Sequence, residues 1–154
     1  MNGDGEKISF EKATVEDVDQ FVTLEKKVVG LKTYSGITGK EEAKTEIEQN
    51  EVYFIKKEDK VVGTTEYQIQ GPDAAYLGGL VVDPEFWGQG IARQAIEFRL
   101  DKLRDIKRVW LVTHPHNSKI IRLYLSYSFI VEAWKDNYYG DGEPRLVLAR
   151  ERSI

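Results

Sequence analysis

The stretch "VVDPEFWGQGIARQAIEF", residues 81–98, decides how the sequence is interpreted. Apolar residues at 80–82 predict a buried strand, and the apolar spacing over 91–103 predicts an amphipathic helix. Between these elements lies "WGQG", which offers no Ser, Thr, Asp or Asn to cap the helix. The sequence therefore predicts a helix whose first backbone N–H groups have no side-chain partner and lie beside two glycines.

A helix start of this kind is suited to bind an anion, because its free N–H groups and its dipole both favour negative charge. A phosphate or pyrophosphate is the natural ligand, and the alternative is that the glycines only shape a tight turn. Arg93 occupies the third glycine position of the dinucleotide motif G-x-G-x-x-G, and no Gly-Lys-Ser/Thr follows. NAD-type and ATP-type sites are therefore disfavoured.

The composition of the 154 residues limits the classes of protein to which the chain can belong. A hydrophobic fraction of 41% fits one soluble domain over residues 1–154, with 1–6 as a loose tail. The net charge of −4 argues against general binding to nucleic acid or to an anionic membrane. There are no cysteines and only two histidines, so no metal site is expected. Without a signal peptide or a membrane span, we expect a cytoplasmic protein.

The pattern of apolar residues predicts a single-domain α/β fold. Helices are expected at 14–28, 40–49, 90–105 and 117–127, and strands at 7–13, 51–57, 60–70, 74–82, 108–113, 129–135 and 145–151. The strand, helix and strand between 74 and 113 form a βαβ unit, so these two strands should be parallel. The other strands should form antiparallel pairs. The prediction is a mixed, mostly antiparallel twisted sheet of about seven strands.

Residues 87–92, after the Val-Asp-Pro end of a strand, resemble the acyl-CoA-binding motif of the GNAT N-acetyltransferases. The family pattern is Gln/Arg-x-x-Gly-x-Gly/Ala. Gly90 and Ala92 match it, whereas Trp87 replaces its first residue. That motif works mainly through backbone amides, so the replacement is tolerable.

A second motif strengthens the resemblance. Asn117 and Tyr124 stand seven residues apart, as in the Asn…Leu-Tyr…Gly-Phe segment of the family, and Ser128 replaces the Gly. The order and separation of the two motifs also agree, and the resemblance extends over nearly the whole chain. It implies the GNAT-like fold, acetyl-CoA as co-substrate and no metal.

The resemblance assigns the donor-binding residues. Backbone amides of the first helical turn would hold the pyrophosphate, and the strand before it would pair with the pantetheine and help to stabilise the oxyanion. Asn117 could contact the pantetheine, cap its own helix, or do both. The implied acetyl-CoA-binding residues are Leu80, Val81, Val82, Trp87, Gly88, Gln89, Gly90, Ile91, Ala92, Arg93 and Asn117.

The resemblance also suggests catalytic residues. Tyr124 is the candidate general acid for the leaving thiol, and its alternative role is to fill the core. In the N-terminal acetyltransferase branch, a Glu or His stands five residues before the Asn, where this chain has Val112. The nearest candidates for the general base are therefore His114 and His116, and Glu66 and Tyr76 on neighbouring strands are further candidates.

The segment "NYYGDGE", residues 137–143, is similar to a Tyr-Tyr…Gly-Glu stretch of the ribosomal-protein and N-terminal peptide acetyltransferases. Tyr138 and Tyr139 would then border the acceptor groove, with Tyr76 on a neighbouring strand; the alternative is a hairpin loop that covers the sheet edge. We expect the 30–39 loop and the 137–145 hairpin to form an open groove for peptides or a closed pocket for metabolites.

The resemblance implies an acetyl-CoA-dependent N-acetyltransferase. Its acceptor would be a primary amine that attacks directly in a ternary complex, since no cysteine can carry the acetyl group. A protein or peptide N-terminal amine is favoured. The alternatives are a small-molecule amine, such as an amino acid, polyamine or antibiotic, or a non-catalytic CoA-binding module. A homodimer is one option for the quaternary state.

Overall fold

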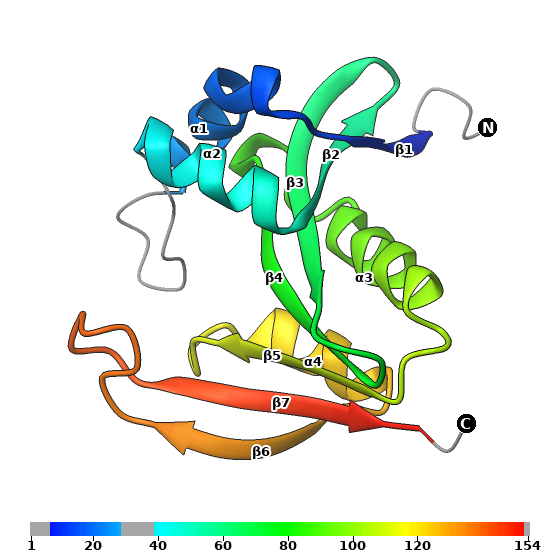
Figure 1. Cartoon of the computed structure of the whole chain (residues 1–154), viewed down its shortest axis with the longest axis vertical. Coiled ribbons are helices and arrows are strands. Elements are labelled where there is room, and N and C mark those ends of the chain that lie inside the picture. The colour runs from blue at the N-terminus through cyan, green and yellow to red at the C-terminus, as the bar shows by residue number, and fades with distance from the viewer. Residues whose placement is uncertain (1–6, 29–38, 153–154) are drawn as a thin grey trace.

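The computed structural model describes residues 7–28 and 39–152 (Figure 1). The strands form one seven-stranded sheet in the order β1-β2-β3-β4-β5-β7-β6. They are β1 (Ile8–Lys12), β2 (Glu51–Lys57), β3 (Lys60–Ile69), β4 (Ala74–Val82), β5 (Arg108–Thr113), β6 (Ile130–Lys135) and β7 (Arg145–Glu151). The helices are α1 (Val18–Lys26), α2 (Lys40–Gln49), α3 (Ile91–Lys102) and α4 (Ser118–Ser126).

The predicted fold class is confirmed. β4 and β5 pair in parallel around the α3 crossover, and every other neighbouring pair in the sheet is antiparallel. The first predicted helix is shorter than expected, because the segment Val15–Asp17 forms a 3-10 turn before α1. In the last hairpin, β7 and not β6 lies beside β5. The periodicity of the sequence did not predict this strand order.

The two faces of the sheet bury different helices, because alternate residues of a strand point to opposite faces. On one face, Val52 and Phe54 of β2 pack in a cluster with α1 and α2. On the other, Ile55 packs with Ile91 and Ala95 of α3. Figure 1 shows α1 and α2 on one side of the first strands and α3 on the other. None of the helices in the described ranges is both long and apolar enough to cross a bilayer.

The parallel pairing of β4 with β5 ends part-way along both strands. Their register runs from Ala74 opposite Arg108 to Leu77 opposite Leu111. Beyond that point the two strands diverge, and β4 continues through Gly78 and Gly79 with β3 alone. The sheet therefore opens between its two halves, on the side where α3 and α4 begin.

The turn that leads from β4 toward α3 is held by a buried carboxylate. Asp83 accepts a hydrogen bond from the backbone N–H of Glu85 at 3.0 Å and forms an ion pair with Lys27 of the α1 end at 2.6 Å. Burial opposes ionisation of Asp83, but the Lys27 ammonium and the Glu85 N–H hold its pKa below the ordinary value. This carboxylate therefore links α1 to the start of the glycine-containing loop.

Replacement of Asp83 by Asn should lower the free energy of unfolding at pH 7 by about 1.5–3 kcal/mol, the usual range for hydrogen bonds to a charged group. Because the folded pKa is depressed, the contribution is present above the unfolded value of about 3.9 and is lost as pH falls through the folded value. Urea unfolding at pH 7 and pH 3 measures both effects. The control is Asp19→Asn, which removes the exposed Asp19–Lys40 pair and should change stability by about 0.5 kcal/mol or less. A loss at Asp83 that persists unchanged at pH 3 would contradict the role of its charge.

Candidate functional site

The predicted uncapped helix start is present. Gly90 is the N-cap of α3, with a left-handed φ of 77°, and no side chain makes a capping hydrogen bond there. Gly88 also has a positive φ, of 82°. A Cβ built on either glycine meets no atom within 4 Å, so the space beside the loop is open and the backbone conformation alone requires glycine. The loop thus presents bare N–H groups to an open space, as an anion site requires.

Neighbouring side chains fix the shape of this loop. The indole N–H of Trp87 donates to the carbonyl oxygen of Val82 at 2.7 Å, so that carbonyl is already used within the protein. Any pairing of the predicted 80–82 segment with a pantetheine must use its other backbone groups. Lys57 of β2 donates to Gln89 at 2.7 Å and brings a cation to the loop. The sequence did not predict Lys57, since it lies 32 residues away from Gln89 along the chain.

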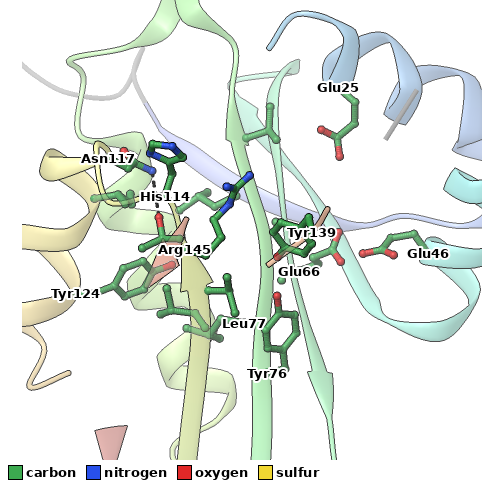
Figure 2. A pocket seen from close by; sticks show the side chains of 18 residues that line it. Glu25, Glu46, Glu66, Tyr76, Leu77, His114, Asn117, Tyr124, Tyr139 and Arg145 are labelled. Atoms are coloured by element: carbon green, nitrogen blue, oxygen red, sulfur yellow. Dashed lines mark hydrogen bonds between the residues drawn. The ribbon is translucent and has the colours of Figure 1, made fainter. Parts of the chain in front are cut away.

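A pocket of about 340 Å³ lies where β4 and β5 diverge. Its walls come from β4 over 77–81, β5 over 111–113 and the start of α4, with side chains from α1, α2 and the β6–β7 hairpin. In Figure 2, Tyr124 and Asn117 lie on one side of the pocket, and Glu25, Glu46 and Glu66 lie on the other. The pocket therefore has a hydroxyl and an amide facing a group of carboxylates.

Tyr124 projects from α4 into this pocket and is almost fully buried, with its ring against Phe129 at 5.2 Å. Its two predicted roles are thus both consistent with its place, since the ring packs in the core while the residue lines the pocket. Asn117 occupies the N-cap position of α4, but the predicted cap is wrong, because its side chain makes no capping hydrogen bond. The amide donates instead to the hydroxyl of Thr113 at 3.4 Å. Asn117 is therefore turned toward the pocket wall.

Glu66 occupies a bulge between β3 and β4. Thr65 pairs with Leu80 and Tyr67 with Leu77, so Glu66 alone stands opposite two glycines of β4. A Cβ on Gly78 would lie 2.7 Å from the Glu66 carboxylate, so the missing side chain makes room for it. This explains Gly78 in the middle of an otherwise apolar strand, whereas a Cβ on Gly79 would make only an ordinary contact with the carboxylate, at 3.8 Å.

The protonation of Glu66 is set by its surroundings. Burial raises its pKa well above the ordinary value; a hydrogen bond and charge repulsion from Glu46 and the charge of Glu25 raise it further, while Arg99 opposes them. Asn50 donates to the same carboxylate at 3.3 Å. A carboxylate with a raised pKa is a stronger proton acceptor than an ordinary one.

His114 is also buried and lines the pocket, but both of its ring nitrogens are engaged. Its Nδ1 accepts the backbone N–H of His116 at 3.0 Å, so the ring proton belongs on Nε2, which lies 2.7 Å from the Glu143 carboxylate. His114 would have to give up a hydrogen bond before it could accept a proton. In this arrangement it ties the end of β5 to the hairpin between β6 and β7.

Of the predicted acceptor-side tyrosines, Tyr76 and Tyr139 line the pocket, and the ring of Tyr138 lies 4.8 Å from that of Tyr139. Tyr76 donates a hydrogen bond to Tyr139, and burial together with the Tyr139 phenol raises the pKa of Tyr76 far above its ordinary value. Tyr138 and Tyr139 are about half exposed. The guanidinium of Arg145, buried and ion-paired with Asp141 at 2.8 Å, lies 5.0 Å from the Tyr139 ring. Most of the predicted 30–39 loop lies outside the described residues.

The matches with known proteins identify the family. Residues 21–129, which are more than half of the chain, match the model of the acetyltransferase (GNAT) family. The chain belongs to this family. The predicted resemblance to this family is therefore confirmed.

Individual GNAT relatives agree with this assignment. The ribosomal protein bS18-alanine N-acetyltransferase of Escherichia coli K12 is 35% identical over 82 residues, which cover 50% of this chain and 55% of that protein. The chain thus spans about half the length of the curated relatives that it matches.

Solved structures show the same fold at low identity. The ribosomal-protein-S18-alanine N-acetyltransferase of E. coli has a TM-score of 0.80 at 23% identity, with 96% of each chain covered. A GNAT family acetyltransferase of Elizabethkingia anophelis, solved with acetyl-CoA bound, has a TM-score of 0.73 at 16% identity, with 97% of this chain and 99% of that one covered.

Replacement of Gly90 by Val should raise the KM for acetyl-CoA roughly ten-fold or more, because a side chain and a changed φ would displace the N–H groups from the pyrophosphate. Initial rates at varied acetyl-CoA measure this, and calorimetry gives the affinity. The matched control is Gly71→Val in the β3–β4 turn, where φ is 79° and the space is equally open. Similar KM changes in both variants would show that backbone strain, and not the loss of an anion site, is responsible.

Proposed function

We propose that the protein transfers the acetyl group of acetyl-CoA to the α-amine of a peptide or protein N-terminus. The observation that carries the proposal is the placement of Tyr124 and Glu66 on opposite sides of one pocket, at the point where β4 and β5 separate. A reaction that removes one proton and donates another needs such a pair. The bare N–H groups of the loop before α3 would hold the donor at the same opening.

In the proposed reaction, the neutral amine nitrogen attacks the thioester carbonyl carbon, a C–N bond forms and the C–S bond breaks. The Glu66 carboxylate takes the proton that the nitrogen loses, directly or through a water. The Tyr124 hydroxyl donates a proton, or a hydrogen bond, to the departing sulfur. No covalent acetyl-enzyme is needed, so the two substrates react in one ternary complex.

Glu66 is preferred to His114 as the base for two reasons. His114 already uses Nδ1 to accept the His116 N–H, whereas burial and the neighbouring carboxylates raise the pKa of the Glu66 carboxyl well above its ordinary value. His114 would instead hold the hairpin of Tyr138 and Tyr139 in place through Glu143. The base that the N-terminal acetyltransferase branch places at Val112 would thus come from a different strand.

Three features favour a peptide N-terminus as the acceptor. Tyr138 and Tyr139 are partly exposed beside the pocket and offer flat aromatic surface for an extended chain. An α-amine has an ordinary pKa near 8, so a weaker base can deprotonate it than a lysine side chain requires. The relative from E. coli K12 is named for the acetylation of an alanine of a ribosomal protein.

The test is thiol release from acetyl-CoA with a panel of acceptors: peptides with a free N-terminus, the same peptides with a blocked N-terminus and an internal lysine, polyamines, amino acids and aminoglycosides. We expect turnover with free N-terminal peptides and none when that amine is blocked. Mass spectrometry of the product locates the acetyl group. Turnover on a small amine alone would overturn the proposed acceptor, and acetyl-CoA binding without any turnover would favour the non-catalytic module.

Replacement of Glu66 by Gln should lower kcat by about 10²–10⁴-fold, the usual contribution of a general base. The same change should stabilise the fold at pH 8. The folded pKa is raised, so ionising Glu66 costs stability as pH rises from its unfolded value of about 4.3 through the folded value. The stabilisation should therefore vanish near pH 4. Steady-state rates and thermal melts at both pH values measure the two effects.

The control for this variant is Glu97→Gln, which removes a carboxylate that accepts a hydrogen bond from Tyr127 and does not line the pocket. Its kcat should stay within about two-fold of the unmodified protein, as expected for a surface change away from the site. A Glu66→Gln variant with full activity would exclude Glu66 as the base.

A further inference from the structure

Arg99 of α3 is a buried cation, and its side chain is 0% exposed. It lies in the apolar stripe of the helix, between Ile96 and Leu100 along the chain. One of its nitrogens, Nη1, donates to the carbonyl oxygens of Glu66 at 3.2 Å and Gly78 at 3.3 Å. The other, Nη2, donates to the hydroxyl oxygen of Tyr124 at 2.5 Å. A single side chain therefore connects β3, β4 and α4 at the pocket.

The two carbonyl groups need such a donor because of the bulge. Glu66 stands opposite Gly78 and Gly79 in a gap of the ladder, so the backbone groups there cannot all pair across the strands. A buried carbonyl group without a partner costs free energy. Arg99 meets this need and at the same time fixes the strand segments that carry Glu66 and line the pocket.

The same bond restricts the hydroxyl of Tyr124. A guanidinium has five N–H donors and no acceptor, so in this bond the Tyr124 oxygen can only accept. The hydrogen of Tyr124 must therefore point elsewhere, and the residue lines the pocket. The positive charge also stabilises any negative charge that develops on the phenol oxygen when it gives up its proton.

We propose that Arg99 is a positioning residue that holds the Tyr124 hydroxyl with its hydrogen directed at the sulfur of CoA. The proposal rests on the proposed function, because it takes Tyr124 to be the group that meets the leaving sulfur. It assigns no contact between Arg99 and the substrates. Arg99 acts through Tyr124 and through the bulge that carries Glu66.

A binding experiment tests the proposal without turnover. Calorimetry at pH 9, where much of a free thiol is ionised, compares the Kd for CoA with the Kd for desulfo-CoA, which lacks only the sulfur. We expect the unmodified protein to prefer CoA by roughly ten-fold, as for a hydrogen bond to a charged group. The preference for CoA over desulfo-CoA should be reduced to the same extent in Arg99→Met and in Tyr124→Phe, because both variants lose the directed hydroxyl. Arg99→Lys should keep part of it, because a lysine can donate to the phenol but cannot reach all three oxygens.

The matched control is Arg150→Met. This change also removes a partly buried guanidinium that donates to a backbone carbonyl, that of Tyr127, but Arg150 does not line the pocket. It should keep the preference for CoA. Thermal melts show which variants fold. If Arg99→Met does not fold, Tyr124→Phe still tests the loss of the directed hydroxyl, because it leaves Arg99 and its two hydrogen bonds to carbonyl oxygens in place.

Kinetics give an independent result. With the best acceptor, Arg99→Lys should lower kcat by no more than Tyr124→Phe does, about 10²–10⁴-fold, with the KM for acetyl-CoA nearly unchanged. In the Tyr124→Phe background, Arg99→Lys should cause no further loss of kcat, because the group through which it acts is already absent.

Three outcomes would overturn the proposal: losses of kcat that multiply in the double variant, a preference for CoA that survives Arg99→Met, or equal binding of CoA and desulfo-CoA by the unmodified protein. If the unmodified protein binds CoA with the expected preference but acetylates no N-terminal peptide, the proposed acceptor fails while the role of Arg99 stands. If it binds neither ligand, the proposed function itself fails, and the role of Arg99 falls with it.

Discussion

The arrangement of the site depends on the early end of the pairing between β4 and β5. A parallel pair that continued beyond Leu77 and Leu111 would close the sheet and use the backbone groups that now face the pocket. Since the pairing stops there, the rest of β4 has one free edge, and α3 and α4 begin on either side of the opening. The Tyr124 side chain reaches the pocket because of this divergence, and the loop that leads to α3 follows directly after the part of β4 that lines the pocket.

Glycines shape the opening in two places, the loop before α3 and the middle of β4, and for different physical reasons. Gly88 and Gly90 are required by positive φ angles, and the space beside them is empty. Gly78 and Gly79 lie within a strand, and at Gly78 a side chain would collide with the Glu66 carboxylate. Gly88 and Gly90 therefore leave backbone N–H groups open to an anion, whereas Gly78 makes room for a buried acid.

The sequence predicted the fold well because its strands and helices carry strong local signals. The bounds of β2, β4, β5, β7 and α2 agree with the predicted ranges, and Gly90 begins α3 without a cap as expected. The position of β7 beside β5 depends on how the last hairpin docks, which no local pattern specifies. Asn117 had a good capping sequence, yet its amide bonds to Thr113, because β5 places that hydroxyl within reach.

The site was less predictable, because its chemistry arises from contacts between distant segments. Glu66 was a candidate base by its strand alone, but its raised pKa depends on burial and on carboxylates from α1 and α2. Lys57 reaches the loop from β2, and Arg99 is a charged residue among the buried residues of α3. Arg99 shows why such a residue is retained: a buried charge is costly, so three acceptors must surround it. Those same acceptors include the strand segment of the proposed base and the hydroxyl of the proposed acid. The cost of burying one cation therefore fixes the geometry of both groups, since Arg99 bonds the backbone carbonyl of Glu66 and makes the Tyr124 oxygen an acceptor, which leaves the proton of Tyr124 free to point into the pocket.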